Sequence, residues 1–420
     1  MRPTIYLDYQ ATTPVAPQVA EAMRPWIETG FANPHSGHGL GREAAAAVEV
    51  ARERVVEALG YSPARVEGSR DTLSSGAEKP GLGFARQAPS TEFIQSAAAG
   101  GVEGLGANGK LYFTSGATEA INWALKGAAS RLPPERRRIV TLATEHAAVL
   151  DTIGYLAGLG FEVEILPVGA DGLLDLEILT CALARPVGLV VAMLVNNEVG
   201  VVQPVAEIAA AARSAGALFL CDAVQGLGHV GIPLADCDLV AVSAHKVHGP
   251  KGIGALWVGH GVELDPLLHG GGQEGGLRSG TLSPALCVGF GEAARLLAER
   301  GEADGDHVER LWGRALKLLP SWTINGSAEH RYRGNLSLRR AGVDSARLIS
   351  ELRGIAFSSG SACASGSGRP SHVLAALGLS DREARSSIRL GFGRYSTEAE
   401  LEEALTLIDA AADRQMSFAA

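Results

Sequence analysis

Apolar and polar positions along the middle of the chain follow two alternating patterns. Short apolar runs with the length and β-branched content of buried strands lie at 111–113, 138–142, 161–166, 189–195, 218–221, 239–243 and 253–258. Apolar residues at helical spacing lie between some of them, at 118–125, 147–156 and 205–214. Strands that alternate with helices predict an α/β domain, in which helices cover a mostly parallel central sheet. Ligands of such sheets bind at the carboxyl ends of the strands.

The two ends of the chain have a different pattern. Helical spacing occurs at 17–27 and 42–59, before the alternating region. After about residue 276 the sequence predicts helices at 284–299, 307–318, 345–353, 371–377 and 398–411, with a strand region at 332–338. We therefore predict a large domain of residues 16–275 and a smaller α+β domain made of residues 1–15 and 276–420.

Residues 68–108 fit neither pattern. The stretch is rich in Gly, Ala, Ser, Gln and Glu, and it is long for a connection inside a compact domain. It is predicted to be a surface insertion, with a short helix at 91–99.

Composition narrows the class of protein. The net charge of −9 argues against a general nucleic-acid or anionic-membrane binder. The first residues contain no apolar signal segment, and the apolar run at 187–195 is too short to span a bilayer. Five scattered cysteines form neither a disulfide framework nor a metal-ligand pattern, so we expect a cytoplasmic protein without a metal site. Four of them have apolar neighbours and are predicted to be packing residues: Cys181, Cys221, Cys237 and Cys287.

Lys246 follows one predicted strand and precedes another, within Ser243-Ala244-His245-Lys246-Val247-His248-Gly249-Pro250. A lysine at the end of a buried strand is costly unless it is paired, shifted in pKa or covalently used. The stretch is therefore open to two interpretations, a solvated turn lysine or a Schiff-base lysine with a hydroxyl and an imidazole beside it for a phosphate.

Other polar groups follow neighbouring strands at the same predicted sheet edge. Thr114-Ser115-Gly116-Ala117-Thr118-Glu119 opens a helix, where free amides hold a phosphate well. His146 and Asn197 follow the next strands, and Asp222 and Gln225 follow the strand at 218–221. An aspartate against a pyridine nitrogen, together with a Schiff-base lysine, marks enzymes that use pyridoxal 5′-phosphate (PLP).

Two further arginine segments and one cysteine segment are candidates for chemistry. Arg278-Ser279-Gly280-Thr281 is suited to a phosphate of its own chain or of a partner subunit, and Arg389 to a carboxylate. Cys363 lies in the Gly/Ser-rich run Ser358-Ser359-Gly360-Ser361-Ala362-Cys363, a setting typical of a reactive thiol.

Taken together, these motifs resemble those of the cysteine desulfurases, PLP enzymes of the class V aminotransferase family with PLP fold type I. The resemblance runs through nearly the whole chain, from Tyr6–Pro14 to Ser386–Thr397. The Ser-Ser-Gly-Ser-Ala-Cys run is similar to that of the NifS/IscS-like branch, the nitrogenase-type and housekeeping iron–sulfur enzymes. The family fold has a large PLP-binding domain and a smaller domain that carries the cysteine loop.

The resemblance implies a role for each motif residue. Lys246 would hold PLP covalently and move protons, and Cys363 would take the sulfur of L-cysteine as a persulfide and serve as a candidate transient iron–sulfur ligand. The other implied residues are His146 stacked on the ring, Asp222 and Gln225 on the ring nitrogen and hydroxyl, Ala117, Thr118, Ser243 and His245 on the phosphate, Thr281 reaching the phosphate from the other subunit of a homodimer, and Asn197 and Arg389 on the substrate carboxylate. A sulfur-acceptor protein would be the partner, with no nucleic acid and no membrane.

The sequence departs from the family pattern in two places, and two other functions stay open. The insertion at 68–108 is not part of the family pattern. The chain also ends soon after the helix that is predicted to end near residue 411, and the longer tail with which housekeeping members dock an iron–sulfur scaffold is not recognisable. One alternative is a selenocysteine lyase or another PLP reaction on the class V fold. The second is a non-catalytic sulfur-assembly protein that retains the fold.

Overall fold

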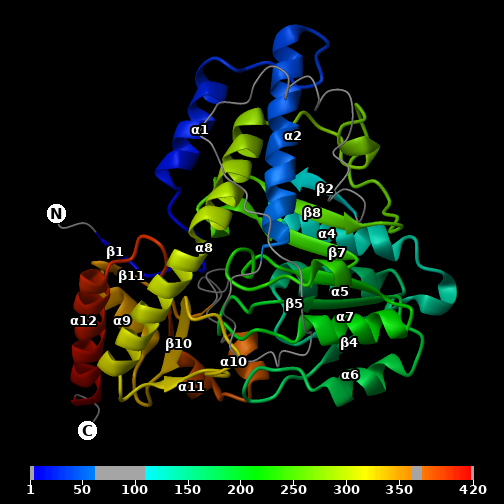
Figure 1. Cartoon of the computed structure of the whole chain (residues 1–420). Helices are drawn as coiled ribbons and strands as arrows, with labels where there is room; N and C mark the ends of the chain where they lie inside the picture. The colour runs from blue at the N-terminus through cyan, green and yellow to red at the C-terminus, as the bar shows by residue number, and fades with distance from the viewer. Residues whose placement is uncertain (1–3, 62–108, 361–370, 418–420) are drawn as a thin grey trace, which may run out of the picture.

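The computed structural model describes residues 4–61, 109–360 and 371–417. The helices are α1 (Pro17–Glu28), α2 (Gly39–Leu59), α4 (Ala117–Ala129), α5 (Ala147–Gly158), α6 (Leu176–Leu183), α7 (Val205–Ser214), α8 (Pro284–Leu318), α9 (Ser345–Glu351), α10 (His372–Ala376), α11 (Asp381–Arg385) and α12 (Glu398–Ser417). The strands are β1 (Ile5–Tyr6), β2 (Gly109–Thr114), β3 (Arg138–Leu142), β4 (Glu162–Leu166), β5 (Leu189–Met193), β6 (Leu218–Asp222), β7 (Leu239–Ser243), β8 (Gly254–Gly259), β9 (Thr323–Ile324), β10 (Asn335–Arg339), β11 (Ile355–Ala356) and β12 (Ser387–Gly391). Figure 1 shows their arrangement.

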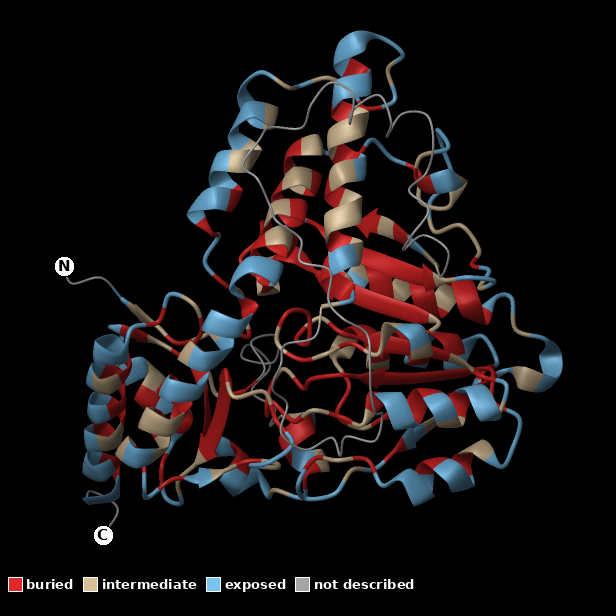
Figure 2. Ribbon diagram, in the orientation of Figure 1, coloured by how far each residue is buried: buried red, intermediate tan, exposed pale blue. Residues whose placement is uncertain are grey.

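A seven-stranded sheet in the order β2-β8-β7-β6-β5-β3-β4 forms the centre of the larger body. β8 is antiparallel to both of its neighbours, and the other strands run in one direction. The inner strands, from β8 to β3, are buried on both faces, as expected of a sheet covered by helices on each side (Figure 2), whereas the edge strand β4 is partly exposed. The predicted α/β fold with a mostly parallel sheet is confirmed.

Successive strand residues belong to different hydrophobic clusters because side chains alternate across the sheet. Val190 and Ala192 of β5 join the cluster that contains residues of α2, α7 and α8, whereas Leu189 and Val191 join the cluster under α4 and α5. The alternation explains why these strands read as continuous apolar runs in the sequence.

A second body of the structure has its own hydrophobic cluster. It combines Leu7 with residues of α8, β10, β12 and α12, around a three-stranded sheet in the order β12-β10-β9. β1 pairs with β11 in a parallel two-stranded sheet, so the first described residues lie against the C-terminal third of the chain (Figure 1).

Two predictions from the sequence are wrong. We expected a break between helices at 284–299 and 307–318, but α8 continues through both as one helix of 35 residues. Gly301 does not end it, because it lies under the ring of Tyr61, where a Cβ atom would come within 2.4 Å of the tyrosine oxygen. Cys181 was expected to be a packing residue, but it is exposed on α6, whereas Cys221, Cys237 and Cys287 are buried. The amphipathic helix turns Cys181 outward while Leu179 and Ala182 face the core.

The predicted insertion at 68–108, including the helix at 91–99, lies outside the described residues. None of the helices in the described part of the chain is long and apolar enough to cross a membrane. No group of three or more His, Cys, Asp or Glu side chains in that part is arranged to hold a metal ion.

Candidate active site

The candidate site residues converge on one cavity of about 720 Å³, which we call the sheet-edge cavity. It lies where β2, β3, β5, β6 and β7 end, as the pattern of strands predicted. Its lining includes ten of the twelve predicted site residues: Ala117, Thr118, His146, Asn197, Asp222, Gln225, Ser243, His245, Lys246 and Arg389. Thr281 is exposed and is not part of the lining, and Cys363 lies outside the described residues.

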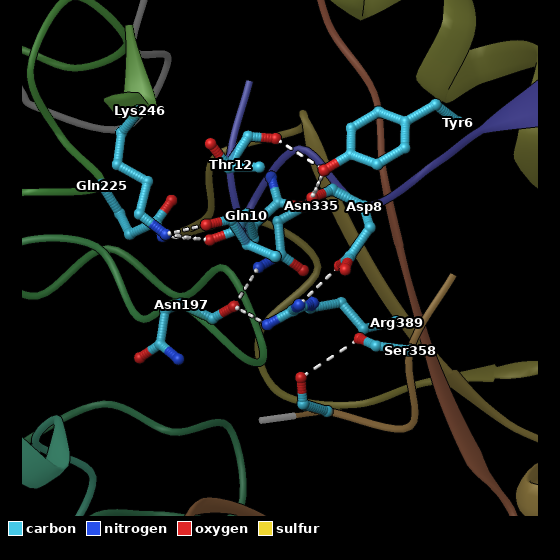
Figure 3. Close-up of polar contacts among 12 residues, drawn as sticks. Tyr6, Asp8, Gln10, Thr12, Asn197, Gln225, Lys246, Asn335, Ser358 and Arg389 are labelled. Carbon is cyan, nitrogen blue, oxygen red and sulfur yellow. Dashed lines mark hydrogen bonds and ion pairs between the residues drawn. The ribbon is translucent and has the colours of Figure 1, made fainter. Parts of the chain in front are cut away.

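Lys246 ends a short 3-10 turn, Ala244–Lys246, between β7 and β8. Its Nζ atom donates to the backbone carbonyl of Ala11 at 2.9 Å and to that of Gln10 (Figure 3). Gln225 Nε2 donates to the same Gln10 carbonyl at 2.9 Å. The lysine therefore points into the cavity and meets the N-terminal segment there, so the interpretation as a solvated turn lysine is excluded.

Asp222 is the last residue of β6, and only 4% of its surface is exposed. Burial raises the pKa of its carboxyl, while a hydrogen bond from the Val224 N–H and the charges of His146 and Lys246 lower it. A buried carboxylate of this kind is stabilised by a cationic partner, and the protonated ring nitrogen of PLP would be one.

One end of the cavity is suited to a phosphate. α4 begins at the cavity wall, and its N-cap residue, Gly116, makes no side-chain cap bond. The amides of Ala117 and Thr118 in the first turn are therefore not capped by that residue. The Ser243 hydroxyl is buried and has no hydrogen-bond partner among the residues that the structure describes. Burial, with Lys246 and Lys251 nearby, lowers the pKa of His245 to about 4, so its imidazole is neutral near pH 7. The unpartnered hydroxyl, the helix amides and the buried aspartate together fit PLP.

His146 lies on the wall of the cavity at the start of α5. Its Nδ1 accepts a hydrogen bond from the Ala148 N–H at 3.0 Å, as the N-cap of the helix. A neutral histidine that accepts through Nδ1 carries its proton on Nε2. This cap fixes the ring and its tautomer, and leaves an N–H donor for the cavity.

Arg389 lies in the middle of β12, with 1% of its surface exposed. Nη2 contacts Asp8 Oδ1 at 2.7 Å and Nη1 donates to the Asn197 carbonyl at 2.9 Å (Figure 3). Within residues 4–61, 109–360 and 371–417, no acceptor contacts its Nε. The guanidinium is therefore held in place at the cavity with part of its hydrogen-bonding capacity unused.

Arg278 and Thr281 were predicted to serve a phosphate. Arg278 instead forms an ion pair with Glu119, whose carboxylate also accepts from the Ser115 N–H. Arg278 therefore supports the turn that begins α4. Thr281 projects from the same segment at the surface.

Several residues of the site were missed from the sequence. Glu198 lines the cavity with 1% of its surface exposed, and burial raises the pKa of its carboxyl. The Ser371 hydroxyl donates to its Oε2, and a Cβ atom on Gly360 would lie 3.0 Å from the same oxygen. Gly360 and Ser371 flank the segment that contains Cys363, so both described ends of that segment lie beside the cavity. Its position five residues after the end of β5 was the available signal for Glu198, but no local pattern connected it with Ser371.

The chain matches a family model and individual proteins over most of its length. The Aminotransferase class-V model matches residues 5–66 and 100–404. Cysteine desulfurase IscS of Rickettsia bellii is 40% identical over 413 residues, which cover 96% of this chain and 90% of the relative. The protein of the same name from Rickettsia typhi is 40% identical over 98% of this chain and 91% of its own length.

Solved structures agree with the sequence relatives. A NifS-like protein superposes with a TM-score of 0.80 at 32% identity, covering 98% of this chain and all of its own. SspA in complex with cysteine superposes with a TM-score of 0.72 at 32% identity, covering 94% of this chain and all of its own. The chain belongs to the class-V aminotransferase family, whose cysteine desulfurase members depend on PLP.

Proposed function

We propose that the chain is a PLP-dependent cysteine desulfurase, which converts L-cysteine to L-alanine and transfers the sulfur to Cys363 as a persulfide. One observation carries the proposal: a single cavity combines Lys246, the buried Asp222 and the unpartnered Ser243 hydroxyl with Arg389. The relatives named cysteine desulfurase and the cysteine-bound SspA structure support L-cysteine as the substrate.

The chain's own residues hold the cofactor at defined atoms. Lys246 Nζ would bind it covalently and later take up and return protons, and Asp222 would keep the ring nitrogen protonated. Ala117, Thr118, Ser243 and His245 would bind the phosphate, and Gln225 would bond the ring hydroxyl. When bound, PLP supplies an electron sink that weakens bonds next to the substrate amino group.

Substrate binding uses the opposite end of the cavity. Arg389 and Asn197 hold the carboxylate of L-cysteine, and Arg389 is suited to this because its guanidinium is fixed before the substrate arrives. His146 would stack on the cofactor ring, and its Nε2 would be positioned for proton transfer because the α5 cap holds Nδ1.

The net sulfur transfer needs no external oxidant. The Cβ–S bond of L-cysteine breaks and an S–S bond forms with the Cys363 thiolate. The two sulfur atoms are oxidised together as the carbon fragment takes the electron pair and a proton, so L-alanine leaves with the persulfide as the only other product. Cys363 then passes the sulfur to an acceptor protein, an iron–sulfur scaffold or a sulfur carrier, in the cytoplasm.

A homodimer would complete the phosphate site. Thr281 is exposed on its own chain and lies outside the lining of its own cavity, as expected of a residue that reaches the phosphate of a partner subunit.

The test compares two cysteines in the holoenzyme. Wild type, Cys363→Ser and Cys181→Ser are incubated with L-cysteine, and alanine, alkylated persulfide by mass and the visible absorbance of the bound cofactor are followed. Cys181 is an exposed thiol and serves as the matched control. We expect wild type and Cys181→Ser to make both products equally, and Cys363→Ser to keep the absorbance response to L-cysteine without making either product. Release of alanine and sulfur by Cys363→Ser at the wild-type rate would exclude Cys363 as the nucleophile.

A further inference from the structure

Asp8 is an acidic residue of the N-terminal segment to which the sequence assigned no role, yet it contacts the arginine of the cavity. Its Oδ1 lies 2.7 Å from Arg389 Nη2, at a separation of 381 residues in the sequence. Asp8 is not part of the cavity lining, so it meets the site only through the guanidinium. Figure 3 shows the pair beside the Asn197 carbonyl.

Both partners of this ion pair are held by backbone contacts. Arg389 N donates to the Ser358 carbonyl at 2.7 Å, and β12 pairs with β10 along its length. The Asp8 carbonyl accepts from the Ala11 N–H at 2.9 Å and from the Tyr6 hydroxyl at 3.1 Å, and the neighbouring Leu7 carbonyl accepts from the Gly391 N–H. The carboxylate is therefore carried by a segment that is fixed beside β12.

The pair leaves Arg389 able to accept a second carboxylate. Asp8 takes one Nη2 proton and the Asn197 carbonyl takes one Nη1 proton, out of the five N–H donors of a guanidinium. The buried Nε proton has no acceptor in the described part of the chain. A substrate carboxylate on the remaining donors would lie within a few ångströms of the Asp8 carboxylate, and like charges so close in a buried site repel.

L-Cysteine and L-alanine carry the same carboxylate, so strong binding of that group would hold the substrate and the product equally. Binding that is uniform between substrate and product lowers KM without speeding the reaction, and it slows product release. The negative charge of Asp8 next to Arg389 would weaken the attraction between the guanidinium and the carboxylate that both amino acids carry.

We propose that Asp8 is a positioning residue that orients the Arg389 guanidinium and weakens its hold on the amino-acid carboxylate, so that the product can leave. The inference rests on the proposed function, because it takes Arg389 as the group that binds the carboxylate of the amino acid.

The test uses two substitutions of Asp8 that separate charge from position. Asp8→Asn keeps an oxygen that accepts from Nη2 and removes the negative charge. Asp8→Ala removes the contact itself. In the holoenzyme we measure KM for L-cysteine, kcat, the competitive inhibition constant of L-alanine and the absorbance change on alanine binding.

We expect Asp8→Asn to lower KM and the alanine inhibition constant together by about tenfold, which corresponds to about 1.4 kcal/mol. Asp8→Ala is expected to raise both constants, because the guanidinium loses its fixed partner. The control Asp304→Asn changes an aspartate of the same type paired with Arg394 at 2.7 Å, outside the sheet-edge cavity, and should leave both constants within about twofold of wild type.

The outcomes distinguish this inference from the proposed function. Constants for Asp8→Asn that stay unchanged or rise would overturn the moderating role, and a fall in both constants for Asp8→Ala would overturn the positioning role. A wild-type enzyme that makes no alanine from L-cysteine would refute the proposed function, whereas the absorbance titration with alanine would still report on Asp8.

Discussion

Arg389 and Arg394 lie five residues apart, and each has a buried side chain in an ion pair with an aspartate, but the two pairs differ in their contacts. In each pair 2% of the arginine side chain is exposed, its aspartate partner is about one-fifth exposed, and the shortest N–O distance is 2.7 Å. Arg394 directs both Nε and Nη2 at Asp304 Oδ2, and Arg300 lies 3.7 Å from the same carboxylate. Arg389 directs only Nη2 at Asp8, and its Nε meets no acceptor among the described residues.

The two arginines also lie beside different cavities. Arg389 lines the sheet-edge cavity, whereas Arg394 and Asp304 line a smaller one of about 320 Å³, which we call the rear cavity. Gln10, Gln225 and Lys246 line both cavities and separate them. Similar burial and distance therefore do not identify a binding arginine. The unused donor capacity of Arg389, next to a cavity with a buried carboxylate and an unpartnered hydroxyl, is the difference that supports the proposed substrate-binding role.

Removal of Lys246, one of the three residues common to both cavities, should have the largest effect. Lys246→Ala is expected to reduce alanine formation by at least about 10³-fold, equivalent to about 4 kcal/mol of barrier, and to abolish the visible absorbance of covalently held cofactor. Lys110→Ala, on the exposed part of β2, is the control. Retention of either property by Lys246→Ala would mean that another amine holds PLP.

Truncation of each arginine tests the comparison directly. Arg389→Ala is expected to raise KM for L-cysteine by about 10²-fold, because a buried charge-assisted contact is lost. Arg394→Ala should change KM by no more than about threefold. Arg389→Ala should lose about 3 kcal/mol of unfolding free energy, because Asp8 is left without its cationic partner, and Arg394→Ala should lose less, because Arg300 still lies 3.7 Å from Asp304. Kinetics and thermal unfolding of the two holoenzymes check this, and equal KM changes would refute the distinction.

A buried histidine that lines the rear cavity should destabilise the protein as the pH falls. Burial, with Arg394 nearby, lowers the pKa of His248 to about 4, so the native state keeps this imidazole neutral while the unfolded chain protonates near pH 6.5. Stability is therefore lost as the pH falls from about 6.5 towards 4, and this residue accounts for about 2 kcal/mol between pH 7 and pH 5.

His248→Asn tests this contribution, because asparagine tolerates the positive φ of 66° at this position and does not titrate. Its unfolding free energy should depend less on pH between 7 and 5 than that of wild type. His35→Asn, an exposed histidine, is the control. An unchanged pH dependence in His248→Asn would show that this imidazole does not contribute.

A buried carboxyl near the sheet-edge cavity should destabilise the protein as the pH rises. Glu145 is fully buried next to Asp222, its Oε1 accepts from the Met193 N–H, and burial raises the pKa of its carboxyl well above the ordinary value. The native state therefore binds a proton that the unfolded chain releases above about pH 4.5, and stability falls as the pH rises towards the raised pKa.

Glu145→Gln removes this titration, so its unfolding free energy relative to wild type should be greater at pH 8 than at pH 5. Urea unfolding of the holoenzyme at both pH values measures this difference. The exposed Glu21→Gln should show none. A wild-type pH profile in Glu145→Gln would mean that this carboxyl is ionised in the folded protein.

The sequence predicts those parts of the site that local patterns determine. Lys246, Asp222 and Ser243 lie at strand ends, and apolar runs locate strand ends well. Contacts made across the chain have no local pattern, so Asp8 and Glu198 were missed. The same limit applies to α8, where residues 300–306 were not predicted to be helical although Gly301 packs against Tyr61 there. It also explains why β12 was not assigned, since it is a strand because β10 lies beside it.

The N-terminal segment has a consequence for the order in which the protein is made. Its residues leave the ribosome first, but Gln10 contacts Lys246 across 236 positions and Asp8 contacts Arg389 across 381. Such contacts form only after most of the chain has been synthesised, and their closure is slow compared with that of local structure. The larger sheet can therefore assemble while synthesis continues, whereas the arginine and its aspartate meet only after β12 has emerged. A chain interrupted before β12 would carry the lysine proposed to hold the cofactor without the arginine proposed to bind the substrate.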